Sequence, residues 1–493
     1  MKTAPGKEQG KFQVTRRQFF GVAAVAGSMA ALSGCKTVDK IGGDSGWLPT
    51  QYRNGANWPV AVKGRVPIDP ANPCIVRRDD ACILCGQCAD VCQNIQTIHG
   101  FYELPVKDAF VCIKCGQCSL WCPTGSIQAN SHIQKVMDAI NDPDVLVVAT
   151  TAPATRVSLG EEFGMAPGTW VEGQQIAALR ALGFDVVLDT NFTADLTIME
   201  EATELVNRLT TGGQMPMMTS CCPGWVNFVE MYYPELMPNL STAKSPMSMM
   251  GALVKTYYAQ KKKVAPSKIF NVAIMPCLSK KGEAARSELN AAGVAAGDET
   301  MRDTDAVLSI RELAYMIKDA GIDFASLPED KYDSLMGEGS GAGIIFGNTG
   351  GVMEAAIRTG YYLVTGQNPP LDLMNLKPVR GLEGIKEATV EIPGFGPLRV
   401  AVGSSLKSAR QLCEEIKAGK ASFDFMEIMA CPGGCIAGGG QPRTLVPPAD
   451  SLREARTESL YKADSKLSKD KRLSHENTEI KTIYKDFLGE AGG

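Results

Sequence analysis

Three buried apolar runs of this sequence end at cysteines, and this recurrence limits the possible folds more than any other feature. The runs and the cysteines that follow them are Met215–Met218 with Cys221 and Cys222, Phe270–Pro276 with Cys277, and Phe425–Ala430 with Cys431 and Cys435. Each run is typical of a buried strand that enters a loop. Because ligand sites in α/β sheets lie beyond the carboxyl ends of strands, the three strand ends are expected to bring these cysteines together.

The shared site has the ligands for one iron–sulfur cluster. Four thiolates, those of Cys222, Cys277, Cys431 and Cys435, would complete a [4Fe–4S] site. Cys221 is left over. Since neighbouring side chains in an extended segment point to opposite sides, we expect Cys221 and Cys222 not to serve the same metal.

The same segments are similar to a known family. TSCCPGW (219–225), MPCLSKKGE (275–283) and MACPGGCIAGGGQP (429–442) occur in this order and resemble the three signatures of the [FeFe]-hydrogenase catalytic domain. The resemblance covers roughly residues 70–490. It implies that the four cysteines hold a [4Fe–4S] cluster. It also implies that Cys435 bridges to a two-iron subsite carrying CO, cyanide and a dithiolate amine, which completes the H-cluster.

Eight further cysteines form two runs with the spacing CxxCxxCxxxC. The runs are Cys82, Cys85, Cys88 and Cys92, and then Cys112, Cys115, Cys118 and Cys122. This is the spacing of bacterial two-cluster ferredoxins, in which the fourth cysteine of each run binds the other cluster. We therefore expect two [4Fe–4S] clusters, one on Cys82, Cys85, Cys88 and Cys122, the other on Cys112, Cys115, Cys118 and Cys92. Zinc is the alternative for paired CxxC motifs, but two matched runs of four favour iron–sulfur clusters.

Composition sets wider limits. The chain has 493 residues, of which 44% are hydrophobic and 21% charged, as expected for a globular protein of more than one domain. A formal net charge of −4 gives no argument for nucleic-acid binding. Of 16 cysteines, only Cys35, Cys74 and Cys413 lie outside the motifs above. Tight CxxC spacing in a chain of this size favours metal over disulfides.

Residues 1–34 are predicted to be a twin-arginine export signal. Arg16 and Arg17 lie in TRRQFF, and a short apolar run, residues 21–32, follows. The run ends at LSGC, which resembles a lipoprotein processing site and would leave Cys35 acylated; ordinary cleavage nearby, with Cys35 incidental, is the alternative. This predicts export of the folded protein by the Tat translocon, to the periplasm or the outer face of the cytoplasmic membrane. Residues 35–68 are predicted to be a tether or surface arm.

The rest of the chain divides into three parts. Residues 69–135 are expected to form an α+β ferredoxin domain, residues 140–450 the catalytic domain, and residues 451–493 a C-terminal wrapping segment. In the catalytic part strands alternate with helices, which predicts an α/β fold with largely parallel sheets. The predicted elements are the strands Val145–Ala149, Val186–Leu188, Ile344–Phe346 and Val400–Val402 and the helices Gln174–Leu182 and Thr197–Leu209.

The resemblance also implies a route for protons between the two-iron subsite and the surface. Residue by residue, the polar relay of the family falls on Cys221, Glu201, Glu204 and Ser241, with Cys221 nearest the metal. Glu201 and Glu204 share a helix face at i, i+3, and their alternative interpretation is an ordinary solvated face. The match at all four positions favours the relay.

Other residues are placed near the diatomic ligands by the resemblance. Lys280 matches the family lysine that hydrogen-bonds a cyanide, and a buried cation needs an anionic partner. The remaining matches are backbone near the other cyanide and apolar side chains that line the pocket: Ala152, Pro153, Met275, Phe346 and Met429. The sequence departs from many members at Met247, where they have glutamine, a change that bears on rate and oxygen tolerance but not on the ligand set.

The sequence therefore predicts an exported [FeFe] hydrogenase that catalyses H2 ⇌ 2H+ + 2e−. One alternative is a regulatory or iron–sulfur-assembly relative without turnover, which Cys221 and the complete third signature argue against. A second alternative is a ferredoxin module whose α/β part only docks a partner, which Lys280 and Cys435 argue against. The expected partners are a c-type cytochrome, a ferredoxin or a membrane carrier for electrons, and hydrogenase maturation proteins that build the two-iron subsite.

Overall fold

The computed structural model describes residues 64–102, 111–420, 422–444 and 448–492. The predicted signal and Cys35 lie outside the described residues, as does the predicted tether as far as residue 63. The described chain groups into two units. Gly64 and Leu84–Gly86 belong to the smaller unit, in which the backbones of Gly64 and Cys85 form a bridge. All other described residues belong to the larger unit, to which the following description applies.

The first sheet is parallel throughout. Its strands follow the order β4 (Val186–Asp189), β3 (Leu146–Thr151), β6 (Ile269–Met275) and β7 (Ala306–Ser309). Almost every residue of these strands is buried, which explains why they are continuous apolar runs rather than alternating ones. One apolar core joins the sheet to the helices α5 (Ile133–Ile140), α6 (Glu172–Ala181) and α13 (Ile310–Asp319).

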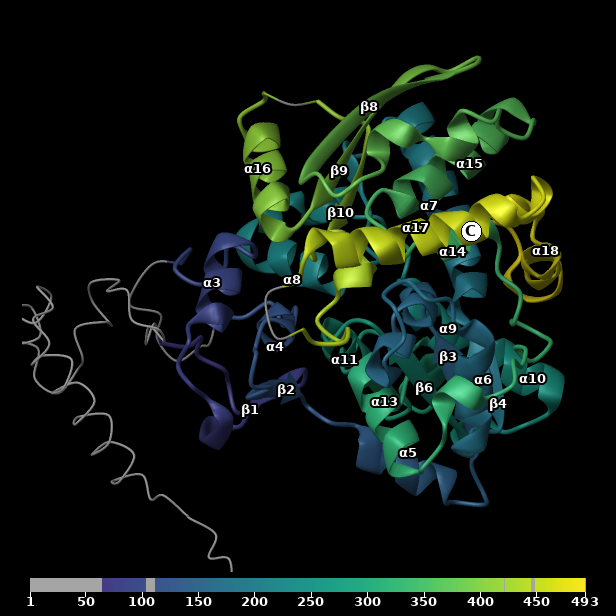
Figure 1. Ribbon diagram of the computed structural model, residues 1–493. Helices are drawn as coiled ribbons and strands as arrows, with labels where there is room; N and C mark the ends of the chain where they lie inside the picture. The colour runs from purple at the N-terminus through teal and green to yellow at the C-terminus, as the bar shows by residue number, and fades with distance from the viewer. Residues whose placement is uncertain (1–63, 103–110, 421, 445–447, 493) are drawn as a thin grey trace, which may run out of the picture. The chain divides into compact units, whose positions relative to one another are not determined.

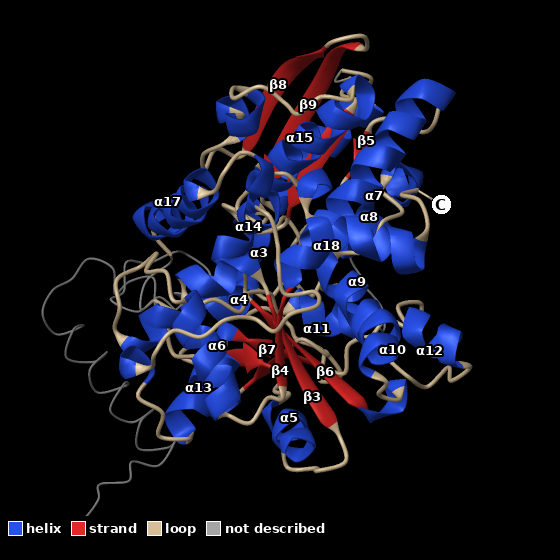
Figure 2. Cartoon of the chain, turned by 90° about the vertical axis from the view of Figure 1, so that its right-hand side faces the viewer, coloured by secondary structure: helices blue, strands red, loops and turns tan. Residues whose placement is uncertain are grey.

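The second sheet is mixed, and Figure 2 shows it as a separate group of strands. Its strand order is β5 (Met217–Met218), β10 (Phe425–Met429), β9 (Gly396–Ser404) and β8 (Ile385–Ile392). The first three strands are parallel, whereas β8 pairs with β9 as an antiparallel hairpin. Figure 1 shows this hairpin beside the helices α15 (Gly351–Thr365) and α16 (Leu406–Lys417). The prediction of an α/β fold with largely parallel sheets is confirmed.

The remaining elements lie outside the two sheets. β1 (Ile75–Arg77) and β2 (Ile127–Ala129) form an antiparallel pair, and the helices α3 (Gln87–Asn94) and α4 (Gln117–Leu120) carry cysteines of the two runs. The other helices are α7 (Thr190–Thr211), α8 (Pro223–Tyr232), α9 (Pro246–Leu253), α10 (Ala259–Lys262), α11 (Ser279–Ala284), α12 (Ala291–Ala296), α14 (Gly341–Ile345), α17 (Asp450–Lys466) and α18 (Thr478–Ile483). None of the helices in the described chain combines the length and apolarity that crossing a bilayer requires.

Helix α7 has both ends defined by its sequence. At the start, the Asp189 carboxylate accepts a hydrogen bond from the Asn191 N–H at 2.9 Å, and at the end Gly212 adopts a φ of 81°. The predicted helix Thr197–Leu209 is therefore the middle of a longer helix. Its buried side carries Glu201, so the fold removes this carboxyl from solvent.

One predicted strand is wrong. Ile344–Phe346 lies in and just after helix α14. The Ser340 side chain caps this helix by accepting from the Ala342 N–H at 3.1 Å. Gly343 approaches α7 so closely that a Cβ there would lie 2.7 Å from the Asn191 carbonyl oxygen. A buried helical turn and a buried strand are both continuous apolar runs, so three apolar residues do not distinguish them.

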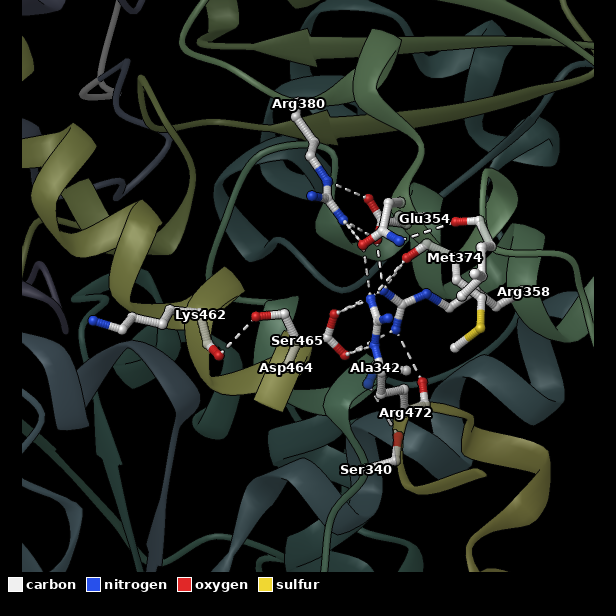
Figure 3. A network of polar contacts seen from close by, with 12 residues as sticks. Ser340, Ala342, Glu354, Arg358, Met374, Arg380, Lys462, Asp464, Ser465 and Arg472 are labelled. Atoms are coloured by element: carbon white, nitrogen blue, oxygen red, sulfur yellow. Dashed lines mark hydrogen bonds and ion pairs between the residues drawn. The ribbon is translucent and has the colours of Figure 1, made fainter. Parts of the chain in front are cut away.

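The C-terminal segment packs onto the catalytic part through buried charges, which Figure 3 shows. We call the residues involved the charge network: Glu354, Arg358, Arg380, Asp464 and Arg472. Arg358 of α15 donates to Glu354 at 2.6 Å and to Asp464 of α17 at 2.9 Å. Arg380 makes a second pair with Glu354, and Arg472 makes a second pair with Asp464. The charge network thereby fixes α17 against α15.

Candidate active site

Four cysteines predicted to share a cluster meet at the ends of three strands. Cys222 follows β5, Cys277 follows β6, and Cys431 and Cys435 follow β10. The thiol of Cys431 interacts electrostatically with those of Cys277, Cys222 and Cys435. That of Cys435 interacts with Cys222 and Cys277. The structure thus brings all four to one place, which we call the cysteine centre.

The cysteine centre has the chemistry of an iron–sulfur site. Burial is the largest cause that raises the pKa of each thiol, to about 12 for Cys277, and the neighbouring thiols add to it at Cys277, Cys431 and Cys435. Four thiolates would therefore need an added positive charge, which a cluster of iron ions provides. Cys222 also precedes helix α8 and accepts from the Ala430 N–H at 3.4 Å, an arrangement that favours a sulfur anion. Buried sulfur donors in this number fit a [4Fe–4S] cluster.

Cys221 has different surroundings from Cys222. Its side chain packs in one apolar cluster with Phe346 and Met429 and is 9% exposed. Burial is the largest cause that raises the pKa of its thiol, and the Glu201 charge is the next. Cys221 is therefore linked to the carboxyl of α7 as well as to the cysteine centre.

Lys280 on α11 is a buried cation with an anionic partner in the chain. Its Nζ donates to Glu283 at 2.7 Å, to the Ser245 hydroxyl at 2.7 Å and to the Cys221 carbonyl at 3.2 Å. Burial alone would lower the pKa of Lys280, but the Glu283 carboxylate raises it, so the ammonium stays charged. Glu283 also accepts from Ser248 at 2.6 Å. These bonds hold the ammonium beside the Cys221 segment.

The predicted lining residues fall into two apolar clusters. Met429 and Phe346 share the cluster of Cys221. Ala152, at the end of β3, shares a second cluster with Met275 and Met247, and Pro153 is buried next to it in sequence. Met247 is 2% exposed, so the residue that departs from the family pattern is packed into this second cluster.

Three of the predicted proton-relay residues lie on two segments. Glu201 and Glu204 are on α7, and Ser241 is in the loop before α9. Burial, with a contribution from the Glu204 charge, raises the pKa of Glu201 to about 8. The Ser241 hydroxyl donates to Glu204 at 2.8 Å. The Ser220 N–H lies 3.5 Å from Glu201 and is a weak donor. Arg208 donates to Glu204 at 2.6 Å.

The outer end of this series reaches the surface. Glu204 and Arg208 line a surface cavity of about 730 Å3 together with Glu200, Lys244 and Glu490. Ser241 is therefore hydrogen-bonded to a carboxylate at an opening, and Glu201 lies on the buried side of the helix that carries this carboxylate. A larger cavity of about 810 Å3, lined by Arg156, Trp170 and Lys462 among others, includes none of the predicted site residues.

The four cysteines predicted to bind the second ferredoxin-type cluster line one small cavity. Cys112, Cys115, Cys118 and Cys92 line a space of about 30 Å3, so the fourth cysteine of the first run stands with the first three of the second. Cys88 and Cys122 pack together in a neighbouring apolar cluster, and Cys82 is half-buried. Cys85 lies in the smaller unit.

Three polar residues of the site escaped the sequence analysis. Glu283 lies at i, i+3 from Lys280 within a segment that resembles the family, so the spacing signalled the pair. Arg208 stands at i, i+4 from Glu204, which also signals contact. Gln117 bonds Cys431 from 314 residues away, and no local pattern predicts such a contact.

Comparison with known proteins agrees with this geometry. A family model of the iron-only hydrogenase large subunit, C-terminal domain, matches residues 145–439, well over half of the chain. The chain belongs to the [FeFe]-hydrogenase family. A second family model, of the iron hydrogenase small subunit, matches residues 450–493. In this [FeFe] hydrogenase, Asp464 and Arg472 of the charge network thus come from the segment that matches a small subunit.

The relatives include several named hydrogenases. The periplasmic [Fe] hydrogenase large subunit of Nitratidesulfovibrio vulgaris is 51% identical over 336 residues, 68% of this chain and 77% of that protein. Iron hydrogenase 1 of Clostridium pasteurianum is 43% identical over 466 residues, 90% of this chain and 78% of that protein. The solved structure of a variant of [FeFe]-hydrogenase HydA1 from Chlamydomonas reinhardtii has a TM-score of 0.65 and 41% identity, covering 74% of this chain and 96% of that one.

The assembly relatives that the sequence left open as an alternative are more distant. Cytosolic iron-sulfur assembly component 3 of Bos taurus is 29% identical over 346 residues, 68% of this chain and 71% of that protein. Membership of the [FeFe]-hydrogenase family implies an enzyme with an H-cluster and iron–sulfur clusters.

Proposed function

We propose that this chain catalyses H2 ⇌ 2H+ + 2e− at the cysteine centre. The observation that carries the proposal is the convergence of four buried or half-buried cysteines beside Cys221, which puts metal ligands next to a group that can carry a proton. Cys222, Cys277, Cys431 and Cys435 would hold the H-cluster, which would supply the chemistry that splits and forms hydrogen, and Cys435 would also serve the two-iron subsite.

Lys280 is the residue proposed to hold the two-iron subsite through a cyanide ligand. In the structure its three N–H donors are taken by Glu283, Ser245 and the Cys221 carbonyl. A cyanide would have to replace one of these acceptors, and the Cys221 carbonyl, at 3.2 Å, is the most distant of them. The buried apolar residues that the family resemblance places near the diatomic ligands are proposed to exclude water from the site: Ala152, Pro153, Met275, Phe346 and Met429. A dry site strengthens the attraction between the ammonium and an anionic ligand.

Protons are proposed to pass between Cys221 and the surface through Glu201, Ser241 and Glu204. A general acid or base works best when its pKa lies near the operating pH, and the pKa of Glu201 at about 8 meets this condition. The hydrogen bond from Ser241 to Glu204 supports the next step. Arg208 holds Glu204 at the opening and also donates to the Leu240 carbonyl at 2.8 Å.

Electrons are proposed to travel through two [4Fe–4S] clusters in a ferredoxin domain formed by residues 69–135. One cluster is assigned to Cys82, Cys85, Cys88 and Cys122 and the other to Cys92, Cys112, Cys115 and Cys118. The cavity lined by the second set supports its assignment. Cys82→Ala should leave hydrogen oxidation with an artificial acceptor partly intact and slow transfer to a protein partner such as a c-type cytochrome, a ferredoxin or a membrane carrier. Equal loss with both acceptors in a folded variant contradicts the relay.

Export is proposed for the N-terminal part of the chain. The twin-arginine signal of residues 1–34 would route the folded protein through the Tat translocon to the periplasm, and the named periplasmic relative supports this location. Arg16→Lys with Arg17→Lys should leave precursor in the cytoplasm. Acylation of Cys35 should appear in the mass of the mature N-terminus and would add a membrane anchor. A free N-terminus elsewhere contradicts lipidation.

The direct test of the function is activity after maturation. Protein produced together with hydrogenase maturation proteins should oxidise H2 with an artificial dye and evolve H2 from a reduced dye. Protein produced without them should bind iron but do neither. The proposal fails if the fully matured, iron-loaded protein shows no hydrogen turnover in either direction.

A further inference from the structure

The side chain of Gln117 reaches from the second cysteine run into the cysteine centre. Its Nε2 lies 3.0 Å from the Cys431 sulfur and 2.8 Å from the Ala437 carbonyl oxygen. The carbonyl can only accept, so the amide nitrogen must face both partners. Gln117 is 1% exposed, and the contact is therefore shielded from solvent.

Close backbone packing holds this amide in place. A Cβ on Gly439 would lie 2.6 Å from the Gly116 carbonyl carbon, and one on Gly116 would lie 2.8 Å from the Leu278 Cβ. The turn that carries Gln117 is thus wedged between the segments that supply Cys431 and Cys277. The Cys115 thiol interacts electrostatically with both of these cysteines.

We propose that Gln117 is a positioning residue that sets the reduction potential of the [4Fe–4S] cluster at the cysteine centre. The inference rests on the proposed function, because it needs that cluster on Cys431. Hydrogen bonds to cluster sulfurs are one of the means by which proteins tune such potentials. One added electron makes the thiolate more negative, so a fixed N–H donor stabilises the reduced cluster more than the oxidised one. Gln117 therefore raises the potential and favours electron arrival from the neighbouring cluster.

The test is a redox titration of the cluster by electron paramagnetic resonance in the matured protein. In Gln117→Leu, the ratio of reduced to oxidised cluster at a fixed ambient potential should fall about tenfold, which is about 59 mV for a one-electron couple. Gln117→Glu has the same shape but presents a carboxylate to the sulfur, so its ratio should fall further. Gln175→Leu is the matched control, because Gln175 is an equally buried amide on α6 whose side chain has no hydrogen-bond partner in the described chain. It should leave the titration unchanged.

A second measurement works without any variant of the site. With 15N in the glutamine side chains of the unmutated protein, pulsed paramagnetic resonance of the reduced cluster should detect a coupled amide nitrogen. Absence of this coupling, or an unchanged midpoint in both Gln117 variants with the cluster bound, overturns the inference while leaving the proposed function intact. Absence of any cluster signal from the cysteine centre in the unmutated matured protein overturns both.

Discussion

Two buried polar centres of this molecule differ in what the chain provides for them. In the charge network, each carboxylate faces two guanidinium groups: Glu354 pairs with Arg358 and Arg380, and Asp464 pairs with Arg358 and Arg472. Burial alone would raise the pKa of Asp464, but the hydrogen bond from Arg472 and the charge of Arg358 hold it below its usual value. Asp464 is therefore ionised with partners from the protein alone.

The cysteine centre is the opposite case. Its thiols face one another, and burial raises the pKa of all four without enough positive charge nearby to reverse the shift. Buried charges are tolerated when they are paired, and unpaired ones neutralise instead. The charge network is therefore a structural connection, whereas the cysteine centre has the chemistry of a ligand site for a metal cofactor.

The largest expected effect comes from removing a ligand of the cysteine centre. Cys277→Ala should abolish hydrogen turnover and lower the iron content, because three thiolates remain where a cluster needs four. Iron analysis and the dye-linked assay measure both losses. Cys413→Ala is the control, since Cys413 is a buried cysteine on α16 that is not among the four of the cysteine centre. Normal iron and turnover in Cys277→Ala would contradict the ligand assignment.

A smaller effect on turnover is expected one step outside the cysteine centre. Cys221→Ala should keep the cofactor but slow turnover by roughly 10²–10⁴-fold, the usual contribution of acid–base groups. Alanine carries no proton, and Cys221→Asp should recover part of the rate because a carboxyl does. Steady-state assays at equal cofactor content measure the difference. Near-normal turnover of the alanine variant would show that Cys221 is not in the relay.

A substitution in the charge network should lower the stability of the fold and leave the iron content unchanged. Asp464→Ala leaves Arg358 and Arg472 with one buried partner fewer, and the free energy of unfolding should fall by about 3–5 kcal/mol. Denaturant titration measures the loss, while iron content per folded molecule should stay unchanged. Lys417→Ala removes an exposed ion pair with Glu235 and should have no measurable effect. If Asp464→Ala lost as much iron as Cys277→Ala, the charge network would not be a purely structural connection.

The last expected effect is spread over several pH units and concerns the pH dependence of stability. The pKa of Glu201 is about 8 in the folded protein against a usual 4.5, so unfolding releases a proton between these values. Stability should therefore fall as pH rises from about 4.5 to 8, by at most about 1.4 kcal/mol per pH unit from this group. Glu201→Gln carries no such proton and should flatten the profile by that amount. If the stability of the unmutated protein and that of Glu201→Gln changed with pH in parallel, the pKa of Glu201 would not be raised.

The parts of the site that follow local patterns were predictable from the sequence. Apolar runs ending in cysteine identified β5, β6 and β10, because a parallel strand is buried on both faces and its loop starts where the run stops. The same reasoning failed at Ile344–Phe346. There the close approach of Gly343 to α7 favours a helix, and this contact depends on the tertiary structure. The Ser340 cap is a local helix-start signal that the three-residue run did not include.

The charges of the site were less predictable than its cysteines. Lys280 was expected to need an anionic partner, and the structure provides Glu283 from the same helix. The bond from Gln117 to Cys431 and the pair of Arg358 with Asp464 in the charge network join residues more than one hundred positions apart. Such contacts have no signature in the spacing of residues, because they arise only after the strands and helices have packed.

The infrared spectrum of the matured protein tests the central claim most directly. Bands from metal-bound CO and cyanide should appear in the unmutated protein and persist in Cys221→Ala, whose cysteine centre is intact. In Cys222→Ala they should be lost, because that change removes a ligand from the neighbouring position. The account is contradicted if the unmutated, matured protein shows no such bands, or if the two alanine variants lose them equally.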